Sequence, residues 1–151
     1  REDEEIGPYS LYEFYIQGDD DRPEVIDRAQ RSDATFHQWT HGSNGTPAHA
    51  CAYHGKPRML ERVLYHGGAV DPLDYYGYTP IMLASQQGHL ECVRILQERG
   101  ASLETKATAS GHRPLSLAQG HLDVCNFLLE HGANPDGANP APDSEESEDE
   151  G

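Results

Sequence analysis

The chain has 151 residues, of which 25% are charged and 36% hydrophobic, and it carries a formal net charge of -15 at pH 7. This length fits one domain, and the sequence has no apolar run of 18 or more residues, so no membrane span is expected. The largest basic cluster is Lys56 and Arg58 with Arg62, which is too small for phosphate binding, so nucleic acid is excluded as an expected partner.

The first 43 residues hold 11 acidic and 4 basic side chains. We interpret residues 1–8 as an acidic extension that resists collapse. Within residues 9–43, two segments rich in apolar residues, 11–17 and 23–29, are separated by Gly18 and three aspartates, Asp19 to Asp21. This order predicts two helices with an exposed acidic connection between them.

A period of 33 residues then begins, with Thr46-Pro47 and Thr79-Pro80 at matching positions. Proline at the first helical position loses no hydrogen bond, and the preceding threonine hydroxyl can accept from a free backbone N–H, so each pair predicts a helix start. Gly55 and Gly88 have the same offset and fit left-handed helix ends.

A second helix follows in each unit, because Leu90, Val93 and Leu96 repeat at helical spacing. Gly67 and Gly100 end these second helices, and residues 102–111 have the composition of an extended hairpin. A third unit begins at Gly111, and Arg113 replaces the capping threonine before Pro114. Its first helix is two residues shorter, which predicts the loss of about half a turn, and Pro135 ends the stack.

The helix start at Thr46-Pro-Ala-His-Ala-Cys-Ala, together with the 33-residue period, resembles the ankyrin repeat. The resemblance implies an all-α ankyrin-repeat solenoid of helix-turn-helix units with hairpin-like fingers. We expect three repeats, at residues 44–76, 77–110 and 111–137, the last shortened and forming a C-terminal cap. Residues 9–43 would be a degenerate capping repeat, or else an unrelated N-terminal extension packed on the first repeat.

In proteins with this resemblance, partners lie along the concave face formed by the finger tips and first helices. Matching positions on the second finger and its helix are Tyr75, Tyr76, Tyr78, Gln86 and Gln87. Three tyrosines at one exposed tip suit recognition, because tyrosine is enriched among interface hot spots, although they could instead pack only on one another. The corresponding positions in the first and third units are Trp39, Ser43, Tyr53, His54, Thr108, His112 and Gln119.

The three cysteines, Cys51, Cys92 and Cys125, have neither metal-ligand nor redox spacing, so we expect reduced core residues in an intracellular, reducing compartment. This would be the cytoplasm, or an organelle if a leader has been removed. The missing initiator methionine indicates either such a removal or a fragment of a longer protein. A nucleophilic Cys51 is the alternative, but its neighbours His49 and His54 do not form a catalytic arrangement.

The resemblance assigns most of the nine histidines a structural role, bonded to backbone groups of the adjacent finger. These residues are His49, His66, His89, His121 and His131. His37 and His41 have the i, i+4 spacing of a zinc pair but no further ligand, so no metal and no cofactor are expected.

The last segment, residues 138–151, holds 6 acidic and no basic side chains and predicts a disordered acidic tail. Ser144 and Ser147 precede acidic residues and resemble casein kinase 2 sites. The tail could dock on a basic surface, or it could only aid solubility.

These observations favour a non-catalytic adaptor or scaffold that holds a protein partner on its concave face. The alternative is a structural accessory subunit built permanently into a large assembly, with neighbours on more than one side. An enzyme is not expected, because no nucleophile, paired carboxylate or phosphate loop lies where the repeats would form a pocket.

Overall fold

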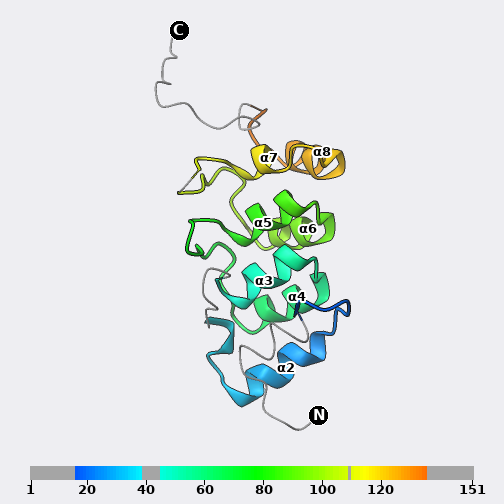
Figure 1. The fold of residues 1–151 in the computed structure, drawn as a ribbon, viewed down its shortest axis with the longest axis vertical. Coiled ribbons are helices and arrows are strands. Elements are labelled where there is room, and N and C mark those ends of the chain that lie inside the picture. The colour runs from blue at the N-terminus through cyan, green and yellow to red at the C-terminus, as the bar shows by residue number, and fades with distance from the viewer. Residues whose placement is uncertain (1–15, 39–44, 109, 136–151) are drawn as a thin grey trace.

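Figure 1 shows the fold as a row of helical layers in a computed structural model, which describes residues 16–38, 45–108 and 110–135. The layers follow chain order from α2 at one end to α7 and α8 at the other. Within the described residues every regular element is helical. These elements are α2 (Pro23–Ser32), η2 (Phe36–Gln38), α3 (Pro47–His54), α4 (Pro57–Tyr65), α5 (Pro80–Gln87), α6 (Leu90–Glu98), α7 (Pro114–Leu117) and α8 (Leu122–Glu130).

The first helices, α3 and α5, start at the predicted Thr-Pro pairs. Thr46 has an extended conformation, and its backbone N–H donates to Nδ1 of His49 at 3.1 Å, so the histidine takes the place of the acidic residue in a capping box. The hydroxyl of Thr79 does not act as predicted, because Oγ1 is buried without a hydrogen-bond partner among the described residues. Gly55 ends α3 with φ 70°, as its position predicted.

The hydrophobic core lies between successive layers. First helices pack on first helices, α3 on α5 and α5 on α7, while second helices pack in the order α2, α4, α6 and α8. Small residues on α3, Ala48, Cys51 and Ala52, are fully or almost fully buried and allow close helix approach. Larger side chains such as Leu60 and Leu96 fill the space between second helices. Burial between neighbours is what makes a repeat stack stable.

The third unit departs further from the repeat than predicted. Its first helix, α7, has 4 residues, whereas α3 and α5 each have 8, so the loss is about one full turn and not half a turn. Arg113 at its N-cap makes no side-chain cap bond, as predicted. Its Nε instead lies 3.6 Å from the Glu104 carboxylate. The surface formed by the first helices α3, α5 and α7, which we call the first-helix surface, therefore has its shortest helix at this end of the stack.

Three side chains join neighbouring layers in the same way. The residue that follows Gly55, Gly88 or Gly120 in each case donates to a backbone carbonyl of the preceding layer. His89 Nε2 donates to the Tyr53 carbonyl at 3.1 Å, and His121 Nε2 donates to the Gln86 carbonyl at 3.0 Å. Lys56 occupies the equivalent position, is only 4% exposed, and donates through Nζ to the Gly18 carbonyl. The N-terminal layer is thus attached by the same joint as the repeats.

The connection before α2 also caps the next layer. Asp21 was predicted to be exposed with its neighbours, but it is half-buried, and its carboxylate accepts from the backbone N–H groups of Arg58 and Met59 at 2.8 and 2.9 Å. These groups lie in the first turn of α4, where backbone donors lack helical partners. Asp19 and Asp20 are exposed, as predicted.

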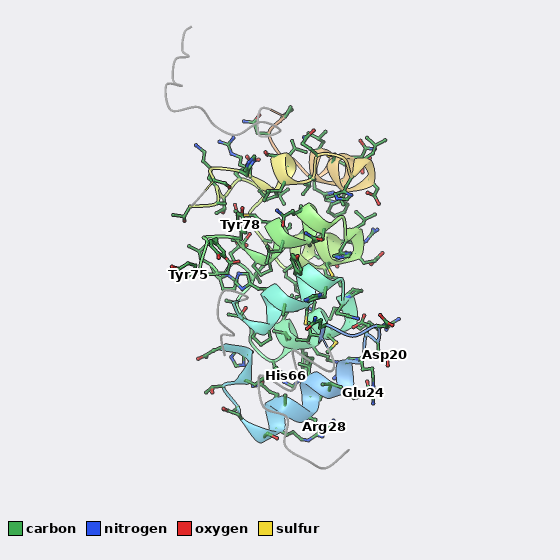
Figure 2. The ribbon with its side chains drawn as sticks, viewed as in Figure 1. Asp20, Glu24, Arg28, His66, Tyr75 and Tyr78 are labelled. Atoms are coloured by element: carbon green, nitrogen blue, oxygen red, sulfur yellow. The ribbon has the colours of Figure 1, made fainter. Side chains whose placement is uncertain are left out.

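We expect Asp21→Ala to lower the free energy of unfolding by about 1 kcal/mol, because it removes the side-chain cap of α4. Urea unfolding at neutral pH measures this loss. Asp20→Ala is the matched control, since it removes the same charge from an exposed neighbour (Figure 2) and should change stability by less than about 0.5 kcal/mol. Equal losses from both variants would show that charge, and not capping, is responsible.

Over the described residues, no helix combines the length and apolar character needed to cross a membrane.

Candidate protein-binding surface

The finger between α4 and α5, residues 70–79, is held by a compact turn. The Asp74 N–H donates to the Tyr78 carbonyl at 2.9 Å, and the Gly77 N–H donates to the Asp74 carbonyl at 3.0 Å. Asp74 Oδ1 also accepts from the N–H groups of Tyr76 and Tyr78, each at 2.9 Å. This turn fixes Tyr75 and Tyr76 at the tip of the finger.

The three tyrosines of this finger have unequal exposure. Tyr75 is 80% exposed and Tyr76 50% exposed, and their rings meet edge to face with centroids 5.1 Å apart. Tyr78 was predicted to be exposed with them, but it is half-buried, and its carbonyl accepts a bond from Nε2 of His49 at 2.8 Å. Figure 2 shows Tyr75 and Tyr78 on the side of the stack where the fingers project. Two of the three therefore form an exposed tip.

A hollow of about 230 Å³ lies between this finger and helices α3 and α5, and we call it the tyrosine hollow. It brings together five residues predicted from the sequence. They are Tyr53, His54, Tyr76, Tyr78 and Gln86. Asp74 and the mostly buried residues His49, Ala50 and Leu83 complete the lining and were not predicted. Asp74 precedes the tyrosines directly, so its place in the finger was a usable signal.

A second, more open depression of about 510 Å³ lies between this finger and the next. It brings Tyr75, Tyr76 and the predicted Thr108 together with Leu73, which is 57% exposed. Sequence reasoning missed Leu73, although an exposed leucine beside two tyrosines is the kind of anchor that interfaces use.

The other predicted site residues lie outside both depressions. Gln87 is exposed at the end of α5, and Gln119 is exposed after α7. His112 is half-buried, and its Nδ1 is hydrogen-bonded to the Ser116 hydroxyl. The structure does not describe four of the predicted residues. These are Trp39, Ser43, Ser144 and Ser147.

The helical part of this surface is uncharged. Helices α3, α5 and α7 contain no aspartate, glutamate, lysine or arginine. The pKa of His49 and that of His54 are both lowered, in each case mainly because burial penalises the charged ring, so both rings are neutral at pH 7. Among the described lining residues of the tyrosine hollow, Asp74 thus supplies the one formal charge.

The histidine roles only partly match the prediction. His49 bonds to the next finger as expected. His89 and His121 bond instead to the preceding layer, at α3 and α5, as described above. His66 Nε2 lies 2.8 Å from the Asp27 carboxylate on α2, and His131 Nδ1 donates to the Phe127 carbonyl of its own helix at 2.9 Å. The prediction of bonds to finger backbone was therefore wrong for these four.

The cysteines are free thiols. Cys51 and Cys92 are buried as predicted, whereas Cys125 is half-buried. Burial raises the pKa of Cys51 well above its usual value and that of Cys92 to about 12, so both thiols stay protonated and are poor nucleophiles.

Across the described part of the chain, no group of three or more histidine, cysteine, aspartate or glutamate residues could hold a metal ion. Of the suggested zinc pair, His37 accepts or donates a bond to Gln30 through Nδ1, and His41 lies outside the described residues.

A comparison of the sequence with models of protein families agrees with the observed fold. A model described as ankyrin repeats (3 copies) matches residues 21–107 and 49–139, and the first match alone covers more than half of the chain. The chain therefore belongs to the ankyrin-repeat family, as its resemblance implied. Ankyrin repeats generally act as protein-protein interaction modules and are typically not catalytic.

Individual relatives are longer than this chain. It is 32% identical over 90 residues to ankyrin repeat protein nuc-2 of Neurospora crassa, covering 58% of this chain and 8% of that protein. It is 37% identical over 89 residues to ankyrin repeat and SOCS box protein 3 of Bos taurus, and this match covers 56% of this chain and 17% of that protein. It is also 31% identical over 124 residues to NF-kappa-B inhibitor alpha of Sus scrofa, and this match covers 78% of this chain and 39% of that protein.

Proposed function

We propose that this chain is a non-catalytic adaptor or scaffold module that holds a protein partner on the surface formed by the tyrosine hollow and the finger tip. The observation that carries this proposal is the juxtaposition of Tyr53, Tyr76 and Tyr78 around one small hollow, with Tyr75 exposed beside it. Aromatic anchors near a concave centre, surrounded by polar side chains, are the usual composition of a binding hot spot.

The family and the chemistry of the surface both support this proposal. One relative is, by its name, an inhibitor of another protein, NF-kappa-B, which is in keeping with a role in protein binding. The buried thiols are protonated and the hollow is smaller than the roughly 300 to 1,000 Å³ of small-molecule sites, which argues for an inserted side chain and not a bound substrate.

The test compares a photo-crosslinking residue at position 75 with one at position 65 in the full chain. Tyr65 is the matched control, because it is 74% exposed at the end of the second helix α4 and lines neither depression. We expect a protein to crosslink from position 75 and not from position 65. With the purified crosslinked protein, the double variant Tyr75→Ser, Tyr76→Ser should bind about ten-fold or more weakly, while Tyr65→Ser should change affinity less than about two-fold.

Thermal melts separate recognition from stability. Because Tyr75 and Tyr76 are exposed, the double variant should retain its melting temperature within a few degrees. A large fall in melting temperature would support the alternative in which the tyrosines only stabilise the finger. Crosslinking from position 65 alone would contradict the proposed surface.

A second candidate, a structural subunit of a large assembly, is favoured by apolar exposure away from the fingers. Tyr65 lies beside a depression of about 430 Å³ that is lined also by Glu61, Arg62 and Arg99. Leu122 is 74% exposed and Leu129 42% exposed on α8. Simultaneous crosslinking from positions 65, 75 and 122 to different neighbours would favour this candidate over an adaptor with one exchangeable partner.

We further propose that residues 9–43 form a capping repeat, which the Lys56 bond to the Gly18 carbonyl supports, because it repeats the joint made by His89 and His121. The free cysteines are consistent with a reducing, intracellular compartment. The acidic extension at 1–8 and the tail at 138–151 lie outside the described residues, so the disorder of the tail and its docking on a basic surface remain predictions.

A further inference from the structure

The tyrosine hollow has a chemical character that its aromatic residues alone do not give it. Its lining combines three tyrosine rings, from Tyr53, Tyr76 and Tyr78, with the carboxylate of Asp74. Among the described residues that line it, none is a lysine or arginine. The result is an aromatic-walled space with one negative charge.

This charge is fixed in position, and no lysine or arginine of the described part of the chain neutralises it. Asp74 Oδ1 is held by two backbone N–H groups, which lock the side chain onto the finger. Over residues 16–38, 45–108 and 110–135, Asp74 forms no ion pair with a lysine or arginine. The carboxylate therefore keeps capacity for a cation that arrives from outside.

The size and chemistry of the hollow restrict what can enter it. At about 230 Å³ it has room for one large side chain. An inserted apolar side chain would remove water from Asp74 without providing a partner, which is costly, and an acidic one would be repelled. A cation gains both the carboxylate and the electron-rich faces of the tyrosine rings.

We propose, on the basis of the protein-binding role argued above, that the tyrosine hollow receives a lysine or arginine side chain from the protein partner. The cation enters beside Asp74, and the tyrosines of the finger and of α3 surround its stem and head. The net charge of -15 adds a long-range attraction that steers a basic segment toward this chain.

The experiment titrates the isotopically labelled full chain with four short peptides of the form Gly-Ser-Gly-Xaa-Gly-Ser-Gly, blocked at both ends, in which Xaa is arginine, lysine, leucine or glutamate. Nuclear magnetic resonance follows the backbone amides of Tyr76, Tyr78 and Leu83. We expect the arginine and lysine peptides to shift these amides at millimolar concentrations, and the leucine and glutamate peptides to leave them unchanged.

Two isosteric variants test whether Asp74 is responsible. Asp74→Asn retains an oxygen that accepts from the finger N–H groups but removes the charge, and it should weaken the arginine peptide about five-fold or more. Asp71→Asn is the matched control on the same finger. Asp71 also accepts a backbone bond, from the Ser102 N–H at 3.0 Å, but it does not line the hollow, so this variant should retain the affinity.

Each result has a distinct meaning. Shifts caused by the leucine peptide and not by the arginine peptide would overturn the cationic occupant while leaving the protein-binding surface intact. Equal weakening by both asparagine variants would attribute binding to net charge and overturn the assigned position. If no peptide shifts these amides, the cation inference fails, whereas crosslinking from position 75 still decides the proposed function independently.

Discussion

Replacing His49 by alanine should lower the free energy of unfolding by about 3 kcal/mol, because it leaves the Thr46 N–H without its acceptor and opens a cavity between α3 and the following finger. His49 is fully buried, and its ring accepts from the Thr46 N–H and donates to the Tyr78 carbonyl. Urea unfolding at pH 7.5 measures the loss. His54→Ala, on the same helix but half-buried, is the control and should cost less than about 1 kcal/mol.

The same variant has an expected pH signature. Burial lowers the pKa of His49 in the folded protein, while the unfolded chain has the ordinary value near 6.5, so the unfolded state binds the proton first as pH falls. The stabilisation is therefore complete above about pH 6.5 and is lost below it. Protonation would also place an N–H against the Thr46 N–H. His49→Ala should consequently lose less stability than the parent between pH 7.5 and 5.5, and an unchanged difference would contradict this account.

Gly77→Ala should be among the most damaging single changes in the finger. Gly77 has φ 84°, where a side chain costs about 1–2 kcal/mol, and an added Cβ would lie 2.6 Å from the backbone nitrogen of Thr108. Because that contact is with backbone, the next finger must move. The total loss in the free energy of unfolding should therefore be at least about 3 kcal/mol. Thermal and urea unfolding of the full chain measure it.

Gly111 provides the matched control for this prediction. It holds the equivalent position in the third finger with φ 76°, but an added Cβ would meet no atom of the described residues within 4 Å. Gly111→Ala should therefore lower the free energy of unfolding only by the cost of a side chain at positive φ, which is about 1–2 kcal/mol. If the two alanine variants were equally unstable, the close approach of neighbouring fingers would contribute nothing, and the contact between Gly77 and Thr108 would not limit their spacing.

The local signals in the sequence predicted the local structure well. A Thr-Pro pair starts a helix and a glycine ends one through contacts within a few residues. The sequence therefore predicted the starts of α3 and α5 and the end of α3. The 33-residue period then predicted the row of layers, because units of equal design stack on one another.

What the sequence did not predict depends on contacts between distant segments. Asp21 and Arg58 are 37 residues apart and meet only because α2 packs on α4, so the cap could not be inferred from either residue. Lys56 looked like part of a basic cluster and is instead buried at a joint. The half-buried state of Tyr78 follows from how the finger folds back toward His49, which no local pattern encodes.

The short α7 gives the first-helix surface a direction. A chain lying along it would meet helices of 8 residues in α3 and α5 and then one of 4 residues, or about 12 Å of wall followed by about 6 Å. Reversing that chain would exchange its deep and shallow ends. The two ends of this surface are therefore not equivalent, so we expect a bound segment to favour one N-to-C orientation and a two-fold symmetric ligand to fit it poorly.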